Sequence, residues 1–220
     1  MGGSWVPGAS PNRAPACTLF PPLRPHSNSD GAGLRPPEGG YSESIVGLHG
    51  SQMITIRCTA KLLKRIGRKA GALAEAVNPT SALGDWHANV LFFYRAQVLL
   101  FVNDNSRLAV VTQARDARNI EAHLAGGLAE LLEHLGVPIP WIHAELSEMR
   151  QAHLAPTRSR SVLATMNDYA FQIEGRYHEW GGVYPLQMSL DLSGCPSGPL
   201  GYRLPGEVTT GFLKARHAGA

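Results

Sequence analysis

Three short apolar stretches decide the fold: His87-Ala-Asn-Val-Leu-Phe-Phe-Tyr94, Gln97-Val-Leu-Leu-Phe-Val-Asn103 and Arg107-Leu-Ala-Val-Val-Thr112. Each has the length and the β-branched or aromatic content of a strand. The gap at Arg95-Ala96 fits only a tight hairpin, and Asn103-Asp104-Asn105-Ser106 has the composition of a turn. The three stretches therefore predict an antiparallel meander.

Apolar side chains of the first two stretches point to both faces of this sheet, because successive residues of a strand alternate. Phe92 and Phe93 are neighbours, as are Leu99, Leu100 and Phe101. A sheet with one solvated face would instead alternate apolar and polar residues. We therefore expect a cover on both faces.

Helical spacing recurs on both sides of the meander. The predicted helices run from a Thr59 cap to about Leu73, from an Asp116 cap to Leu135, from Pro140 to about Met149, from a Ser161 cap to about His178, and over a short C-terminal segment with Val208 and Phe212. Met53-Ile-Thr-Ile-Arg-Cys58 and the alternating segment Leu186–Leu192 predict two more strands. The expected class is α+β, with an antiparallel or mixed sheet that contains a three-strand meander and is covered by three to four helices.

Residues 1–52 differ in character from the rest of the chain. Nearly half of them are Gly, Pro or Ser, and no apolar run is long enough for a helix or strand. Such a segment cannot bury enough apolar surface to offset its ordering entropy. We expect a disordered tail, which a flexible linker, a carrier of short motifs or a start codon assigned too early would each explain. A single α+β domain is expected over residues 53–216.

Charge and cysteine content narrow the class of protein. The formal net charge of +3 at pH 7 is too small to identify a nucleic-acid-binding protein by itself. The cysteines Cys17, Cys58 and Cys195 form neither a disulfide framework nor a paired metal-ligand motif. The N-terminus lacks the pattern of a secretory signal, and the longest apolar runs are far too short to span a bilayer. We expect a cytoplasmic protein without a membrane anchor.

Four ordered motifs support a family resemblance. They are Met53-Ile-Thr-Ile-Arg-Cys-Thr-Ala-Lys-Leu-Leu63, Leu83-Gly-Asp-Trp-His-Ala-Asn89, Arg160-Ser-Val-Leu-Ala-Thr-Met-Asn-Asp-Tyr-Ala-Phe171 and Gly198-Pro-Leu-Gly-Tyr202. Over about residues 53–213 the chain resembles a bacterial family, domain of unknown function family 6933. The resemblance implies a domain boundary that excludes the tail, and it implies no activity.

A cluster of basic residues opens the predicted domain. Its members are Arg57, Lys61, Lys64, Arg65, Arg68 and Lys69. On a helix most of these charges lie opposite the apolar residues, and such a face attracts phosphate backbones or an acidic protein. The alternative is an ordinary solvated helix face. No aromatic residue interleaves the charges, which argues against recognition of single strands.

A second set of polar residues comes from two distant segments. The set comprises Asp85, Trp86 and Asn89, and Arg160, Asn167, Asp168 and Glu174. If the 84–89 loop packs near the predicted helix, two or three carboxylates could converge on a hydrolytic or Mg²⁺ site. Alternatively, Asp85 and Asn89 bond to loop backbone, and Asn167 bonds across a junction between helix and sheet.

The remaining histidines and cysteines predict no metal and no cofactor. His143-Ala-Glu145 matches a short element of zinc deaminases, but its Pro-Cys-x-x-Cys partner is missing. Cys58 is expected to be a buried, inert thiol. The best-supported function is a non-catalytic binding module that contacts a phosphate-bearing or acidic partner, nucleic acid or protein, through the 57–69 segment. The alternative is a metal-dependent hydrolase that uses Asp85, Asp168 and Glu174.

Overall fold

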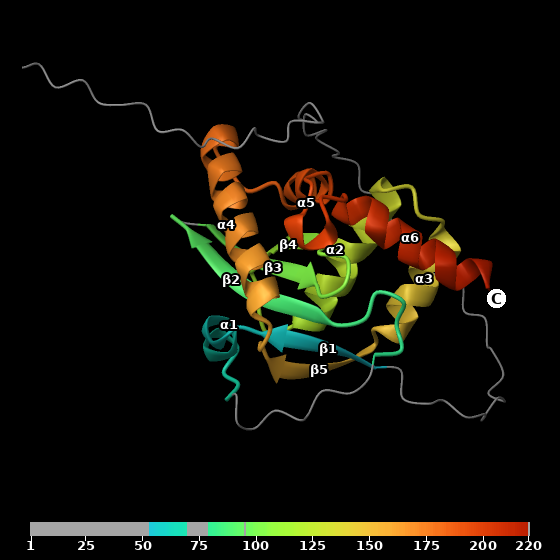
Figure 1. Cartoon of the computed structure of the whole chain (residues 1–220). Helices are drawn as coiled ribbons and strands as arrows, with labels where there is room; N and C mark the ends of the chain where they lie inside the picture. The colour runs from blue at the N-terminus through green and yellow to red at the C-terminus, as the bar shows by residue number, and fades with distance from the viewer. Residues whose placement is uncertain (1–52, 70–78, 95, 220) are drawn as a thin grey trace, which may run out of the picture.

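The computed structural model describes residues 53–69, 79–94 and 96–219, and these form a mixed five-stranded sheet with helices on both faces (Figure 1). The strands are β1 (Met53–Cys58), β2 (Trp86–Phe93), β3 (Ala96–Asn103), β4 (Ala109–Gln113) and β5 (Gln151–Pro156). The helices are α1 (Ala60–Arg65), α2 (Ile120–His134), α3 (Ile139–Glu148), α4 (Arg160–Trp180), α5 (Pro185–Ser193) and α6 (Pro205–Ala218), with a 3₁₀ turn, η2 (Gly198–Leu200). The predicted α+β class is confirmed. The predicted tail over residues 1–52 and the continuation of the first helix to Leu73 lie outside the described residues.

The strands are ordered β4-β3-β2-β1-β5. Strands β2, β3 and β4 pair antiparallel and form the predicted meander. The hairpin register places Val90 opposite Leu99 and Phe92 opposite Gln97. Strand β1 pairs parallel with both β2 and β5, so the sheet is mixed.

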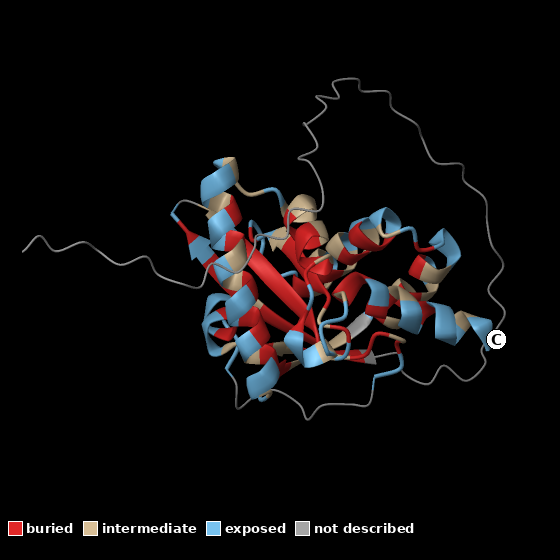
Figure 2. Ribbon diagram, turned by 45° about the horizontal axis from the view of Figure 1, so that its top comes forward, coloured by how far each residue is buried: buried red, intermediate tan, exposed pale blue. Residues whose placement is uncertain are grey.

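Apolar residues of the central strands are buried on both faces, as expected (Figure 2). On one face Leu99 and Phe101 of β3 pack with the buried stripes of α2 and α3. On the other face Val98 and Leu100 pack with the buried residues of α4. The alternation within β3 therefore builds two core clusters, one on each side of the sheet.

The prediction of a strand over Leu186–Leu192 is wrong, because this segment is helix α5. Its apolar residues alternate, yet they are also spaced by four. Leu186 and Leu190 pack against the α2 side of the core, whereas Met188 and Leu192 belong to the α4 side. This helix lies at the edge of the sheet, and its apolar side chains therefore pack into both core clusters. Pro185 at its first turn favours this helical start.

The fifth strand, β5, was not predicted. It is short, lies at an edge of the sheet and ends at Pro156, which cannot donate to a ladder. Its pairing with β1 is non-local, from Ile54 with Ala152 to Cys58 with Pro156. No signal within the segment itself specifies that partner.

Two predicted helix caps are also wrong. Helix α2 begins after Asn119 rather than at Asp116. Helix α4 is capped by Ser159, whose hydroxyl accepts the Val162 N–H at 3.3 Å, while Ser161 lies inside the first turn. Both errors are shifts of a few residues. They arise because Ser, Asp and Asn are all common N-caps, so each helix start offers more than one candidate.

Candidate binding surface

Helix α1 presents the predicted basic cluster. The Thr59 hydroxyl accepts the Leu62 N–H at 3.4 Å and donates to Asn89 Oδ1 at 2.8 Å, which ties the helix start to β2. Leu62 and Leu63 are buried. The helix ends early because Gly67 adopts a φ of +72°, a conformation that favours glycine. The prediction that the helix continues through residues 67–69 is therefore wrong.

Five of the six predicted binding residues are exposed around this helix. They are Lys61, Lys64, Arg65, Arg68 and Lys69, which we call the α1 surface. None of the five forms an ion pair with another residue in the described part of the chain. Arg68 and Lys69 follow the end of the helix rather than lying on it. The α1 surface therefore carries uncompensated positive charge.

The α1 surface contacts the end of the β2–β3 hairpin. The Lys61 ammonium lies 4.5 Å from the centroid of the Phe92 ring. Arg65 Nη2 donates to Gln97 Oε1 at 3.3 Å. Phe92 and Gln97 are cross-strand partners, so both cations touch one residue pair. Sequence reasoning missed Phe92 and Gln97, because nothing in the local spacing brings β2 to the basic segment.

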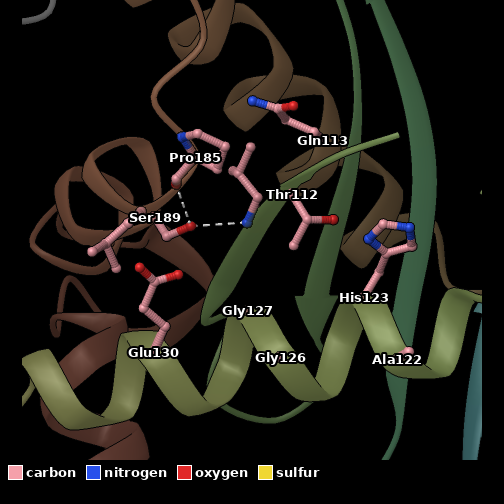
Figure 3. Close-up of a pocket in the computed structure, with 11 residues that line it drawn as sticks. Thr112, Gln113, Ala122, His123, Gly126, Gly127, Glu130, Pro185 and Ser189 are labelled. Carbon is pink, nitrogen blue, oxygen red and sulfur yellow. Dashed lines mark hydrogen bonds between the residues drawn. The ribbon is translucent and has the colours of Figure 1, made fainter. Parts of the chain in front are cut away.

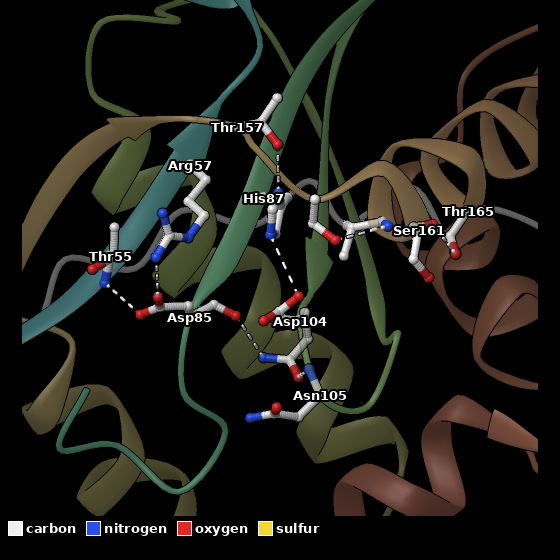
Figure 4. A network of polar contacts seen from close by, with 12 residues as sticks. Thr55, Arg57, Asp85, His87, Asp104, Asn105, Thr157, Ser161 and Thr165 are labelled. Carbon is white, nitrogen blue, oxygen red and sulfur yellow. Dashed lines mark hydrogen bonds and ion pairs between the residues drawn. The ribbon is translucent and has the colours of Figure 1, made fainter. Parts of the chain in front are cut away.

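Arg57, the sixth predicted binding residue, lies in a separate polar network on β1 (Figure 4). Its Nη2 donates to Asp85 Oδ2 at 3.1 Å. Asp85 Oδ1 accepts the Thr55 N–H at 3.1 Å, and the Asp85 carbonyl accepts from Asn103 Nδ2 at 3.3 Å. Asp85 thus links the loop before β2 to β1 and β3. This agrees with a structural use of the carboxylate for backbone bonding.

His87 lies at the centre of this network and is 1% exposed. Its Nδ1 is 2.7 Å from Thr157 Oγ1, and its Nε2 faces Asp104 Oδ1 at 3.5 Å (Figure 4). Burial lowers the pKa of His87 to about 4, and Arg57 acts in the same direction against the opposing effect of Asp104. The imidazole is therefore neutral at pH 7. Sequence reasoning did not name His87, Asp104 or Thr157 as site residues.

The other predicted carboxylates do not join Asp85. Asp168 and Glu174 are exposed on the outer side of α4. Among the described residues no group of three or more His, Cys, Asp or Glu is arranged to hold a metal ion. The hydrolase alternative therefore gains no geometric support.

The remaining members of the predicted polar set are dispersed. Trp86 is buried on the α2 side of the sheet, and Arg160 is exposed at the start of α4. Asn89 accepts bonds from the Thr59 hydroxyl and from the Val90 N–H at 2.9 Å. Asn167 is exposed, so the expectation that it bonds at the margin of the core is wrong. Asn167 lies next to the buried stripe of α4, and its side chain is exposed to solvent rather than packed against the sheet.

Two residues considered for metal chemistry or catalysis have structural surroundings. Glu145 is 3% exposed and accepts the Ala82 and Leu83 N–H groups at 3.0 and 3.1 Å, which anchors the loop before β2. Burial raises the pKa of its carboxyl. Cys58 is buried, as expected, and burial raises the pKa of its thiol to about 12.

A shallow groove of about 290 Å³ lies between β4, α2 and α5 (Figure 3). Here Ser189 Oγ accepts the Val111 N–H and donates to the Pro185 carbonyl, both at 2.8 Å. This hydroxyl satisfies a backbone donor on the free edge of β4. Glu130 and His123 line the groove from α2. The bonds within the groove attach α5 to the edge of the sheet.

The fold and the exposed residues define an α+β domain with a mixed sheet, one basic surface and a buried polar network. Among the described residues no helix is long and apolar enough to cross a membrane. The family model described as "Domain of unknown function (DUF6933)" matches residues 55–208, and the chain belongs to this family. No curated protein and no solved structure matches the chain. The family membership confirms the resemblance drawn from the four sequence motifs.

Proposed function

We propose that this protein is a non-catalytic binding module, and that its α1 surface contacts a phosphate-bearing or acidic partner. The observation that carries the proposal is the exposure of five cations within nine residues, none of them ion-paired to a described residue. Four arginines elsewhere, Arg57, Arg107, Arg176 and Arg216, each pair with a carboxylate. Exposed cations also occur at other places, such as Lys214, but the α1 surface gathers five of them within one short segment.

Phosphate groups suit such a surface for two reasons. Clustered Lys and Arg side chains attract anions over about a Debye length, and they release condensed counterions when they bind a nucleic-acid backbone. The surface also keeps its shape, because Leu62 and Leu63 anchor α1 in the core. We infer a cytoplasmic location for this module, in line with the free thiol of Cys58.

A salt titration of the full-length protein with a labelled DNA duplex tests the proposal. If about four cations of the α1 surface contact phosphates, log K should fall with log salt with a slope of about −3.6. A Lys64→Glu, Arg65→Glu variant should weaken binding and flatten the slope. The matched control is Arg203→Glu, Lys214→Glu, since both residues are exposed and lie just before and within α6, on the opposite side of the molecule from α1 (Figure 1).

Labelled polyglutamate supplies the second arm of the test, because an acidic protein would offer carboxylates in place of phosphates. We expect either ligand to bind at low salt and to be released by the α1 variant alone. The proposal is refuted if neither nucleic acid, duplex or single-stranded, nor polyglutamate binds, or if both charge reversals weaken binding equally.

A further inference from the structure

Exposed aromatic side chains end the β2–β3 hairpin. Phe92 is 46% exposed, and Tyr94, which directly follows β2, is 83% exposed. The Tyr94 ring is nevertheless held in place. It stacks on Tyr177 of α4, with centroids 6.0 Å apart and planes inclined by 15°, and it meets the His178 ring edge-on at 5.5 Å. One face of Tyr94 is thus supported while most of the side chain is open to solvent.

The support beneath Tyr94 extends into the core. Tyr177 also stacks on Phe93, with centroids 6.0 Å apart, and Phe93 is buried. A ring that is fixed before binding loses little conformational entropy when a ligand stacks on it. The hairpin end therefore presents a preorganised aromatic platform.

This platform and the α1 surface meet around the end of the β2–β3 hairpin. Lys61 lies over Phe92, and Phe92 is two residues from Tyr94, which corresponds to about 7 Å of extended chain. Phe92 is on the α1 side of the sheet, whereas Tyr94 stacks on α4 at the other face. Arg65 reaches the opposite strand at Gln97. The cations thus lie beside Phe92 on one face of the hairpin end, and Tyr94 lies on the other face, although the basic segment itself contains no aromatic residue.

We propose that the ligand of this combined surface is a single-stranded nucleic acid. Its phosphates contact the α1 surface, and a base stacks on Tyr94, with Phe92 as the second aromatic contact. This inference rests on the proposed function and specifies its ligand. Positive charge next to exposed rings is the combination that binds single strands, because every base has a face that can stack. In a duplex the neighbouring base pairs cover those faces, so Tyr94 would add little to duplex binding.

The acidic residues of α4 limit the path of such a strand. Glu174 and Glu179 are exposed within one turn of Tyr177 and His178. Their charges repel phosphates, so the strand runs from α1 across the hairpin end and does not continue along α4. The surface fits a short stretch of backbone, with recognition by stacking rather than by base sequence.

The experiment measures binding of full-length protein to a labelled oligothymidine of about 12 nucleotides, within the range of single-strand site sizes, and to a duplex of equal length. We expect Tyr94→Ala to weaken oligothymidine binding by about 5- to 150-fold, the equivalent of one stacked base. The affinity of the Tyr94→Ala variant for the duplex, and the slope of log K against log salt, should stay unchanged, because the phosphate contacts remain. Tyr94→Trp should retain single-strand binding, and Phe92→Ala should weaken it in the same direction as Tyr94→Ala.

Tyr202→Ala is the matched control. Tyr202 is 78% exposed and has a φ of +63°, close to the 83% and +48° of Tyr94, but it makes no ring contact with a described aromatic residue. Its replacement should leave both affinities unchanged.

The outcomes separate this inference from the proposed function. If Tyr94→Ala leaves oligothymidine binding intact, or weakens duplex binding equally, the single-strand inference is overturned and the basic surface still stands. Binding of polyglutamate without either nucleic acid overturns the inference in the same way. If the unmodified protein binds none of the three ligands, both proposals fail.

Discussion

The ammonium group of Lys61 lies 4.5 Å from the centroid of the Phe92 ring, which joins α1 to the end of the β2–β3 hairpin. A contact of this kind at an exposed site contributes only about 0.5–1 kcal/mol. Its importance is geometric, since it places the basic segment beside the exposed Phe92 ring of another strand. The hydrogen bond from Arg65 to Gln97 is a second contact between α1 and the end of the hairpin.

Two adjacent glycines of α2 provide a test of packing against β4. A Cβ at Gly127 would meet Thr112 Cγ2 and Val110 Cγ1, each at 2.7 Å, whereas a Cβ at Gly126 meets nothing within 4 Å. The β-branched neighbours cannot easily rotate away. Gly127→Ala should therefore cost about 1–3 kcal/mol of unfolding free energy. Gly126→Ala should add about 0.5–1 kcal/mol, because Ala is the better helix former. Urea denaturation of both variants checks this, and equal stabilities would contradict the close α2–β4 approach.

The buried stripe of α2 should dominate the stability of its side of the sheet. Leu128 has no exposed surface and belongs to the core cluster beneath the sheet. Leu128→Ala should lower the unfolding free energy by about 2–5 kcal/mol. Glu133→Ala, at an exposed position of the same helix, should change it by less than about 0.5 kcal/mol. A small effect at Leu128 would mean that α2 does not pack as described.

A buried ion pair joins α4 to α5. Arg176 Nε lies 2.6 Å from Asp191 Oδ2, and the two side chains are 10% and 8% exposed. Asp191→Ala should cost about 3–5 kcal/mol, because the Arg176 charge stays buried without this carboxylate. The double change Arg176→Met, Asp191→Leu should recover most of that loss. For comparison, the exposed Arg216–Glu148 pair should contribute at most about 1 kcal/mol, so Glu148→Ala serves as the control in the same thermal or urea unfolding series.

His87 should make the fold sensitive to mild acid. Burial lowers its pKa in the folded state to about 4, with Arg57 and Arg107 acting in the same direction and Asp104 and Asp85 opposing. In the unfolded chain the group titrates near its ordinary value of about 6.5. Between these values only the unfolded state binds the proton, so stability falls as the pH drops from about 6.5 to about 4. The slope is at most about 1.4 kcal/mol per pH unit.

A His87→Gln variant isolates this effect, since glutamine can still bond to Thr157 but does not titrate. Urea denaturation from pH 7.5 to pH 4 should show a shallower loss of stability in the variant than in the unmodified protein. Parallel profiles would show that His87 does not bear the acid sensitivity.

The sequence by itself determined the meander and the stripe of α2. Both depend on local patterns. Strands β2 and β3 are joined by a tight hairpin, so their pairing follows from chain proximity. The apolar residues Ile120, Leu124, Leu128 and Leu131 share one side of any helix they form. The exposed basic segment was also predictable, because its charges lie between apolar residues that needed to be buried. The four family motifs are likewise local, because each is defined by the identity and order of adjacent residues.

Tertiary structure alone decided the features that depend on a distant partner. The alternation from Leu186 to Leu192 suits a strand and a helix equally, and α5 is a helix because it lies between two core clusters. Similarly, β5 is a strand because the edge of β1 is open to it. The placement of Phe92 beside Lys61 and the pairing of Arg57 with Asp85 join segments that have no common periodicity. Packing of the whole chain selects such contacts, since the entropy of closing the intervening loops is recovered only when the complete core is buried.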